Sequence, residues 1–85
     1  MATLTVSVIS PEKVLFEGEV ESVVAPAFDG EVGILPQHAP MVTLLGKGVL
    51  RLGEGGRAGR FEIAGGFLQV ADNQVRVVTE HANSL

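Results

Sequence analysis

The sequence contains no cysteine, no tryptophan and no tyrosine. Without cysteine the chain can form neither disulfides nor thiolate metal sites, so it lacks the covalent cross-links of many small secreted domains. We therefore expect a reducing compartment. Without tryptophan or tyrosine it lacks the amphipathic aromatic side chains with which sugar-binding surfaces usually present their ligands. The absence disfavours a β-sandwich module for a small ligand or carbohydrate, which remains the alternative reading.

Two further features are missing, a long apolar run and a basic stripe. No stretch approaches the roughly 20 apolar residues that span a bilayer, and the N-terminus lacks the basic and then apolar pattern of a signal peptide. Six lysines and arginines against ten acidic residues give a formal net charge of -4, and the scattered cations offer no stripe for phosphates. We expect a cytosolic chain that inserts into no membrane and binds no nucleic acid.

Motifs for chemistry are also missing. His38 and His81 have no neighbours spaced as in a metal-binding motif, and no serine lies in a nucleophile elbow. The glycines of 53–56 lack the lysine and the following helix of a phosphate-binding loop. Glu19 and Glu21 share a strand face, as solvated carboxylates often do. A small hydrolase would need titratable groups that converge in a pocket, so we expect no catalytic, cofactor or metal-binding residue.

What the sequence does contain is aliphatic residues in short runs, separated by glycine and proline. Leu4, Val6 and Val8 alternate with polar residues, as in a strand with one buried face, and no helical periodicity appears. The predicted strands cover residues 3–9, 13–17, 19–25, 41–45, 48–52, 60–64, 67–71 and 74–79, with shorter ones between 26 and 40. We expect residues 1–85 to form one all-β domain, a two-layer β-sandwich of about ten short strands.

Turn residues predict how these strands are connected. Gly18 is expected to turn the chain after the second strand. Gly46 and Lys47 predict a tight hairpin between the strands at 41–45 and 48–52. Asp72 and Asn73 predict another, because both residues tolerate the left-handed backbone of such turns. The glycine-rich residues 53–56 form a further turn.

Residues 30–43 differ from an ordinary loop. Their glycines and prolines restrict the backbone, and the segment also carries His38, Met41 and several aliphatic side chains. A stiff segment that displays mixed apolar and polar groups is typical of a binding surface. We predict that residues 30–43 form a protein-docking ledge.

Three motifs in order resemble one known family. The run Gly30, Glu31, Val32, Gly33, Ile34, Leu35, Pro36, Gln37, His38, Ala39, Pro40, followed by Thr43, is similar to the hallmark of the epsilon subunit of F-type ATP synthases. The opening Val8, Ile9, Ser10, Pro11, Glu12, with Phe16, Gly18 and Val20, resembles that family's first strands. Gly65, Gly66, Phe67, Leu68, Gln69 and Val70 resemble its Gly-Gly signature. The resemblance covers residues 4 to 82.

The resemblance implies a ten-stranded sandwich at the foot of the central stalk. Its expected partners are the gamma subunit, met by Ser10, His38, Met41 and Thr43, and the c ring, met by Phe28, Asp29, Gly30, Glu31 and Val32, with Glu31 facing a cationic loop. The implied role is to fasten gamma to the c ring without catalysis, in a peripheral position on the cytoplasmic face of the inner (plasma) membrane. Family members usually continue into a C-terminal helical hairpin that can inhibit ATP hydrolysis or bind ATP, and the sequence to Leu85 contains none.

Overall fold

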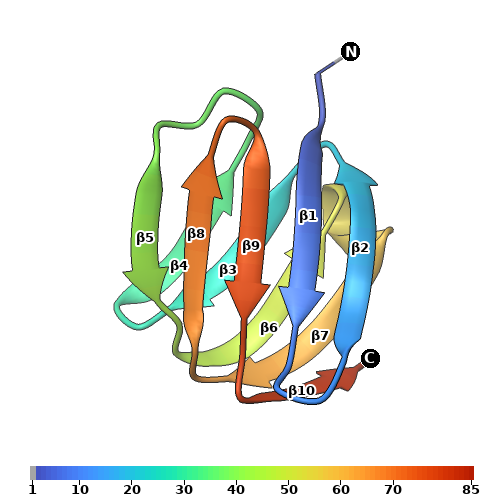
Figure 1. Cartoon of the computed structure of the whole chain (residues 1–85), viewed down its shortest axis with the longest axis vertical. Helices are drawn as coiled ribbons and strands as arrows, with labels where there is room; N and C mark the ends of the chain where they lie inside the picture. Colours follow the sequence, from blue (N-terminus) through green and yellow to red (C-terminus); the bar gives the residue numbers. More distant parts are fainter. Residues whose placement is uncertain (1) are drawn as a thin grey trace.

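The computed structural model describes residues 2–85, which form two five-stranded sheets packed face to face (Figure 1). The first sheet has the strand order β2-β1-β9-β8-β5 and the second the order β10-β7-β6-β3-β4. The first sheet comprises β1 (Leu4–Ile9), β2 (Val14–Val20), β5 (Met41–Leu44), β8 (Phe67–Ala71) and β9 (Gln74–Val78). The second comprises β3 (Val23–Ala27), β4 (Gly30–Ile34), β6 (Lys47–Leu52), β7 (Gly59–Ala64) and β10 (His81–Ser84). The predicted all-β two-layer sandwich is confirmed.

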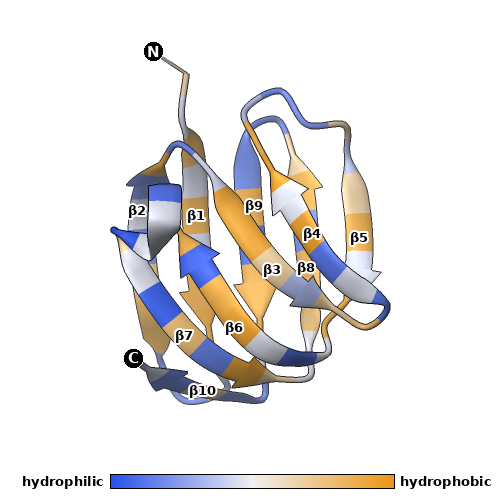
Figure 2. Ribbon diagram, turned by 180° about the vertical axis from the view of Figure 1, so that it is seen from behind, coloured by the Kyte–Doolittle hydropathy of each residue, from blue (hydrophilic) through white to orange (hydrophobic). Residues whose placement is uncertain are grey.

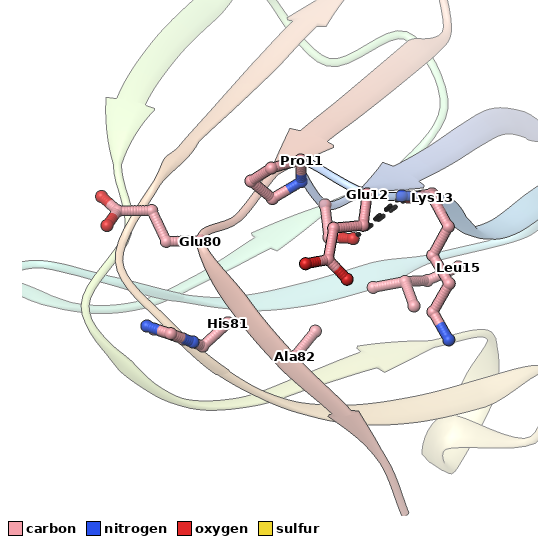
Figure 3. A pocket seen from close by; sticks show the side chains of 8 residues that line it. Pro11, Glu12, Lys13, Leu15, Glu80, His81 and Ala82 are labelled. Carbon is pink, nitrogen blue, oxygen red and sulfur yellow. Dashed lines mark hydrogen bonds between the residues drawn. The ribbon is translucent and has the colours of Figure 1, made fainter.

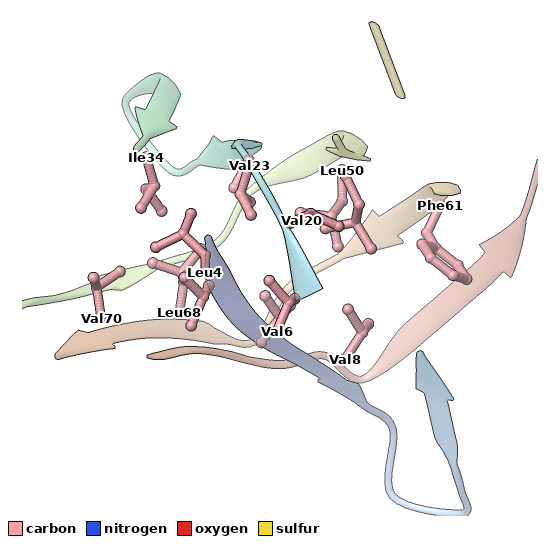
Figure 4. Close-up of a cluster of buried hydrophobic side chains, with 14 of the residues drawn as sticks. Leu4, Val6, Val8, Val20, Val23, Ile34, Leu50, Phe61, Leu68 and Val70 are labelled. Carbon is pink, nitrogen blue, oxygen red and sulfur yellow. The ribbon is translucent and has the colours of Figure 1, made fainter. Parts of the chain in front are cut away.

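The core lies between the two sheets and follows from the alternation of each strand. Leu4, Val6 and Val8 on β1 are fully buried, whereas the residues between them face outward. From the opposite sheet Ile34, Val23, Leu50 and Phe61 point toward the same layer (Figure 4). The same alternation appears from the other side as hydrophilic and hydrophobic bands along β6 and β7 (Figure 2). The buried layer is aliphatic except for Phe61.

The predicted hairpin at Gly46 and Lys47 is wrong. β5 pairs with β8 in the first sheet, whereas β6 pairs with β7 and β3 in the second. The chain therefore crosses from one sheet to the other here. Gly46 donates its N–H to the Pro26 carbonyl at 2.8 Å, and a Cβ on Gly46 would lie 3.1 Å from the Ala27 carbonyl oxygen. The glycine allows the close approach to β3 that the crossing requires.

Gly18 does not turn the chain either. It lies inside β2 opposite Val6, and the strand continues to Val20. The break comes at residues 21–22, so the run predicted at 19–25 is divided between the end of β2 and the start of β3. The sequence also gave no signal for β10, a short edge strand that pairs with β7. The predicted hairpin at Asp72 and Asn73 is confirmed, since both have positive φ, 51° and 60°, between β8 and β9.

The Gly-Gly pair at 65–66 has a structural explanation. Gly65 and Gly66 have φ angles of 75° and 108°, which side chains disfavour. A Cβ on Gly66 would overlap the Val78 carbonyl oxygen. Thr79, the one buried polar residue among the described residues, donates from Oγ1 to the Gly65 carbonyl at 2.9 Å. This turn therefore joins the start of β8 to the end of β9.

Candidate protein-docking surface

The four residues predicted to meet gamma do not share one spot. Ser10 follows β1, whereas His38 lies in the loop between β4 and β5 at the opposite end of the sandwich (Figure 1). Met41 and Thr43 lie on β5, opposite the buried Val70 and Leu68, so their side chains face the core side of the sheet. A single compact contact cannot include all four.

Two of these residues also have local structural roles. The Ser10 hydroxyl donates to the Lys13 carbonyl at 3.2 Å and accepts the Lys13 N–H at 3.3 Å, which closes the turn between β1 and β2. The His38 Nδ1 lies 2.7 Å from the Ala39 carbonyl oxygen, so this nitrogen carries the proton and donates. Nε2 of His38 remains available to a partner.

The loop that carries His38 has a defined turn. His38 donates its N–H to the Leu35 carbonyl at 3.2 Å, which closes a four-residue turn. Pro36 is the second residue of this turn, and Gln37, the third, has a φ of 69°. These features define a type II turn, in which the third residue needs a positive φ. The Gln37 N–H is in turn held by Asn73 Oδ1 at 2.6 Å. The loop is thereby fastened to the β8–β9 turn, which supports the predicted stiffness of this part of the ledge.

The five residues predicted to meet the c ring lie together on one hairpin. Phe28 and Asp29 connect β3 to β4, since Ala27 pairs with Gly30, and Phe28 is 67% exposed. Val32 faces inward and packs against the core, so its side chain supports the hairpin. Glu31 faces outward and forms an ion pair with Arg51, at 2.8 Å from Oε2 to Nη2.

A further apolar feature crosses the outer face of the first sheet, and sequence reasoning missed it. Backbone pairing places Leu44 opposite Phe67, Phe67 opposite Val78, and Val78 opposite Ile9, which faces Val14. Opposed residues share a face, so these five side chains form one transverse line; the strand ends that carry them lie at the lower end of the sheet in Figure 1. We call it the apolar row; it consists of Leu44, Phe67, Val78, Ile9 and Val14.

The apolar row is accessible. Leu44 is 63% exposed, Val14 55% and Phe67 38%, and the other two are partly exposed. Single exposed apolar side chains are ordinary, whereas an aligned set across a whole sheet is a candidate interaction surface. Ser10 directly follows Ile9, next to the Val14 end of the row, and Thr43 directly precedes Leu44 at the other end. Both predicted residues are therefore close to the row in sequence, although the side chain of Thr43 faces the core.

The row also adjoins the predicted c-ring hairpin. Phe28 donates its backbone N–H to the Leu44 carbonyl at 3.0 Å. This bond holds the exposed Phe28 turn beside the end of the row. The two predicted partner surfaces thus meet at one corner of the sandwich, where β5 ends and the β3–β4 turn begins (Figure 1).

No comparable site for a small molecule appears in residues 2–85. One depression of about 270 Å³ lies between the β1–β2 turn and β10 and is lined mainly by polar residues (Figure 3). It contains Glu12, Glu80 and His81, and no hydrogen bond joins these three side chains. Typical ligand pockets are about 300–1,000 Å³ and mostly apolar. Within the same residues, no group of three or more potential ligands could hold a metal ion, and no helix has the length and apolar character to cross a membrane.

The glycine-rich turn at residues 53–56 is bonded to a carboxylate of the same chain. η1 (Glu54–Gly56) is a single 3₁₀ turn, and the Glu54 N–H is bonded to Glu21 Oε1 at 3.2 Å. An internal carboxylate therefore sits where a phosphate-binding loop would receive an anion, and the β7 strand follows instead of a helix.

The fold and the exposed apolar row are typical of a small β-sandwich domain of the protein-binding class. The family model described as "ATP synthase, Delta/Epsilon chain, beta-sandwich domain" matches residues 3–84. The chain belongs to this ATP synthase delta/epsilon family, as the resemblance of its motifs predicts.

Curated relatives and solved structures agree with this membership. The chain is 51% identical over 78 residues to the ATP synthase epsilon chain of Leptospira borgpetersenii serovar Hardjo-bovis (strain JB197), covering 92% of this chain and 61% of that protein. It is 44% identical over 80 residues to the epsilon chain of Desulforamulus reducens, covering 94% and 61%. The chain thus spans about three fifths of the length of these relatives.

Among solved structures, the Euglena gracilis mitochondrial ATP synthase (OSCP/F1/c-ring) contains a chain with a TM-score of 0.87 and 26% identity, over 99% of this chain and 54% of that one. A chain of the Tetrahymena thermophila mitochondrial ATP synthase (central stalk/c-ring) has a TM-score of 0.77 at 15% identity, over 96% and 66%. This second likeness supports the fold alone.

Proposed function

We propose that this chain is a rotor subunit of a proton-translocating ATP synthase that fastens the gamma subunit to the c ring and is not itself catalytic. The observation that carries the proposal is the apolar row beside the exposed Phe28 turn. Family membership and the likeness to a chain of the Euglena gracilis assembly, whose name includes F1 and the c-ring, support the same role. The subunit would be peripheral, at the cytoplasmic face of the plasma membrane.

Gamma is assigned to the apolar row and to the edge of β5. Val42, 67% exposed on β5, extends the apolar surface from Leu44 toward the loop of His38. Ser10 and His38 then flank one continuous surface at its two extremes. The c ring is assigned to the β3–β4 hairpin, through the Phe28 turn and Glu31.

The available surface suffices for two partners. The domain exposes 5106 Å², and a standard interface takes about 800 Å² from each partner. Two such interfaces would cover about a third of the domain.

The domain must also carry a mechanical load. Each proton charge delivers about 2.3 kcal/mol per 100 mV of membrane potential, so a domain that transmits this energy from the c ring to gamma must resist shear. A close-packed core between two hydrogen-bonded sheets meets this requirement.

The test is co-purification of the chain with gamma and with the c ring. The double variant Leu44→Ser/Phe67→Ser should lose most gamma binding and retain ring binding. Glu31→Lys should show the reverse, because a cationic partner would meet a like charge. Val49→Ser, a partly exposed valine on the outward face of β6, is the matched control and should bind both partners.

All three variants alter exposed or partly exposed side chains, so their unfolding free energies should lie within about 0.5–1 kcal/mol of the parent. Undiminished capture of both partners by the double variant and by Glu31→Lys would contradict the assigned faces. Loss of binding in Val49→Ser would contradict the location of the docking surface.

A further inference from the structure

Four adjacent strands of the first sheet carry one charge among many neutral side chains on their outer face. Above the apolar row, backbone pairing aligns Val42, Gln69, Arg76 and Ser7 as a second row, and Ala71, Gln74 and Thr5 as a third. On the four strands β5, β8, β9 and β1, Arg76 is the sole charged residue. The acidic Glu17 and Glu19 lie on β2, at the edge of the sheet.

The guanidinium of Arg76 has no partner within residues 2–85. The ion pair found among these residues joins Arg51 to Glu31 on the other sheet, and no side-chain hydrogen bond involves Arg76. Two shallow depressions flank this arginine. One, of about 250 Å³, is lined by Gln69, Ala71 and Gln74, and the other, of about 270 Å³, includes Thr5, Ser7 and Ile9.

We propose that Arg76 is the electrostatic anchor of the gamma interface and receives a carboxylate side chain of gamma in one of these depressions. The inference rests on the proposed function, because it takes gamma as the partner that covers the apolar row. Arg76 is two residues from Val78 on the same face of β9, so a partner on the row also covers Arg76. Covering it without an acceptor would leave a charge desolvated and unpaired, which is strongly unfavourable.

Charge and geometry both favour a carboxylate. The guanidinium presents donors in a planar fork that matches a carboxylate in two parallel hydrogen bonds. Arg76 is the one cation on these four strands, and the acidic Glu17 and Glu19 lie two strands away on β2, so an acidic group of the partner is attracted to the position of Arg76 and not to the β2 edge. Arginine next to an apolar contact is a common hot spot of protein interfaces.

A second copy of this chain fits less well. A two-fold symmetric pairing of this face on itself brings the same patch of both copies together. A two-fold axis through the centre of these four strands would bring the two Arg76 side chains together, while the nearest carboxylates, Glu17 and Glu19, lie on β2 at the edge of the sheet. Self-association is therefore an outcome of the test and not the proposal.

The test compares the affinity of purified gamma for Arg76→Glu, Arg76→Lys and the parent chain at two salt concentrations. Arg76→Glu should weaken binding about 30-fold or more, as expected when one member of a covered charge pair is reversed. Arg76→Lys should recover only part of this loss, because lysine lacks the planar fork. A gamma variant with the matching carboxylate changed to lysine should restore binding to Arg76→Glu and to no other variant.

Arg57→Glu is the control, since Arg57 is exposed in the connection between η1 and β7 and the variant has the same change of net charge. It should bind gamma within about threefold of the parent, because screening reduces distant exposed charges. An equal loss in Arg57→Glu and Arg76→Glu would overturn the anchor in favour of general electrostatics.

The two proposals fail in different ways. If Leu44→Ser/Phe67→Ser loses gamma while Arg76→Glu binds normally, the anchor is wrong and the docking face stands. If neither variant weakens binding, the assignment of gamma to this face is wrong. A concentration-dependent dimer of the parent chain that Arg76→Glu abolishes or strengthens would assign the face to a second copy and overturn the anchor.

Discussion

At the scale of single residues, Gly66 is the position where packing leaves least freedom. Its φ is 108° and a Cβ would overlap the Val78 carbonyl oxygen. We expect Gly66→Ala to lose about 2–5 kcal/mol of unfolding free energy, from backbone strain and overpacking together. The melting temperature should fall by about 10 °C or more for a domain of this size, as measured by thermal and urea unfolding.

Gly33 provides the control for that substitution. It lies in the edge strand β4, and no atom lies within 4 Å of the position of its Cβ. Gly33→Ala should therefore change stability by less than about 1 kcal/mol, and the reduced freedom of the unfolded chain favours a small gain. If both variants melt at the same temperature, the account of the Gly-Gly turn is incorrect.

A sequence motif locates candidate contact residues along the chain but does not give the orientation of their side chains. The resemblance implies Met41 and Thr43 as contacts because they follow His38 closely in the sequence, but the sheet turns both toward the core while Val42 and Leu44 face outward. Alternation within 41–44 could have shown that two faces exist. It could not show which face is covered, because that depends on the partner strand and the opposite sheet.

At the scale of elements, the loop between β4 and β5 depends on Asn73. The Asn73 side chain accepts the Gln37 N–H at 2.6 Å, and its backbone carbonyl accepts the Thr5 N–H at 2.8 Å. Asn73→Gly keeps the positive φ and the backbone bond but removes the side-chain acceptor. The Gln37 amide should then exchange its hydrogen about tenfold faster, since one such bond contributes about 1 kcal/mol.

Asn73→Asp is the matched variant, because aspartate tolerates the left-handed backbone and retains the acceptor oxygen. The Gln37 amide should stay protected in this variant, as measured by hydrogen exchange resolved by NMR. Equal exchange rates in the glycine and aspartate variants would show that the loop is held by other contacts. The effect should be confined to 35–40, because the hairpin backbone is the same in both variants.

The strands were more predictable than their connections. Most strands follow from short alternating runs between glycines, and the turn at Asp72 and Asn73 follows from residues that tolerate positive φ. The pair at Gly46 and Lys47 has the composition of a hairpin but serves as a crossing between sheets. Sequence periodicity identifies a strand and its buried face, whereas the choice of neighbour is made by contacts far along the chain. The parallel pairing of β1 with β9 is another such choice.

At the scale of the whole molecule, the candidate surface is assembled from all parts of the chain. The apolar row takes one residue from each of five strands, between Ile9 and Val78, and pairing alone aligns them. No local window of sequence contains this pattern. The hairpin proposed to meet the c ring, in contrast, is contiguous in sequence, so a local segment, residues 28–32, predicts it as one unit.

Both sheets share one core, so we expect the domain to unfold as one cooperative unit. Leu68 on β8 is fully buried, on the same face of the strand as Val70, in the layer that faces Ile34 and Val23 (Figure 4). Leu68→Ala should cost about 2–5 kcal/mol through lost burial and the cavity left behind. Hydrogen exchange of slow amides should accelerate by the same factor in β8 and β1 and in β3 and β6, because global opening exposes all of them.

Gln69→Ala, one residue further along β8, is the control. Gln69 is exposed on the outer face, so its truncation should leave these exchange rates within about twofold of the parent, as for surface substitutions. Acceleration in the first sheet alone after Leu68→Ala would mean that the sheets open separately. Such a sandwich could shear between its layers under load, and the rigid coupling proposed between gamma on one sheet and the c ring on the hairpin of the other would lose its physical basis.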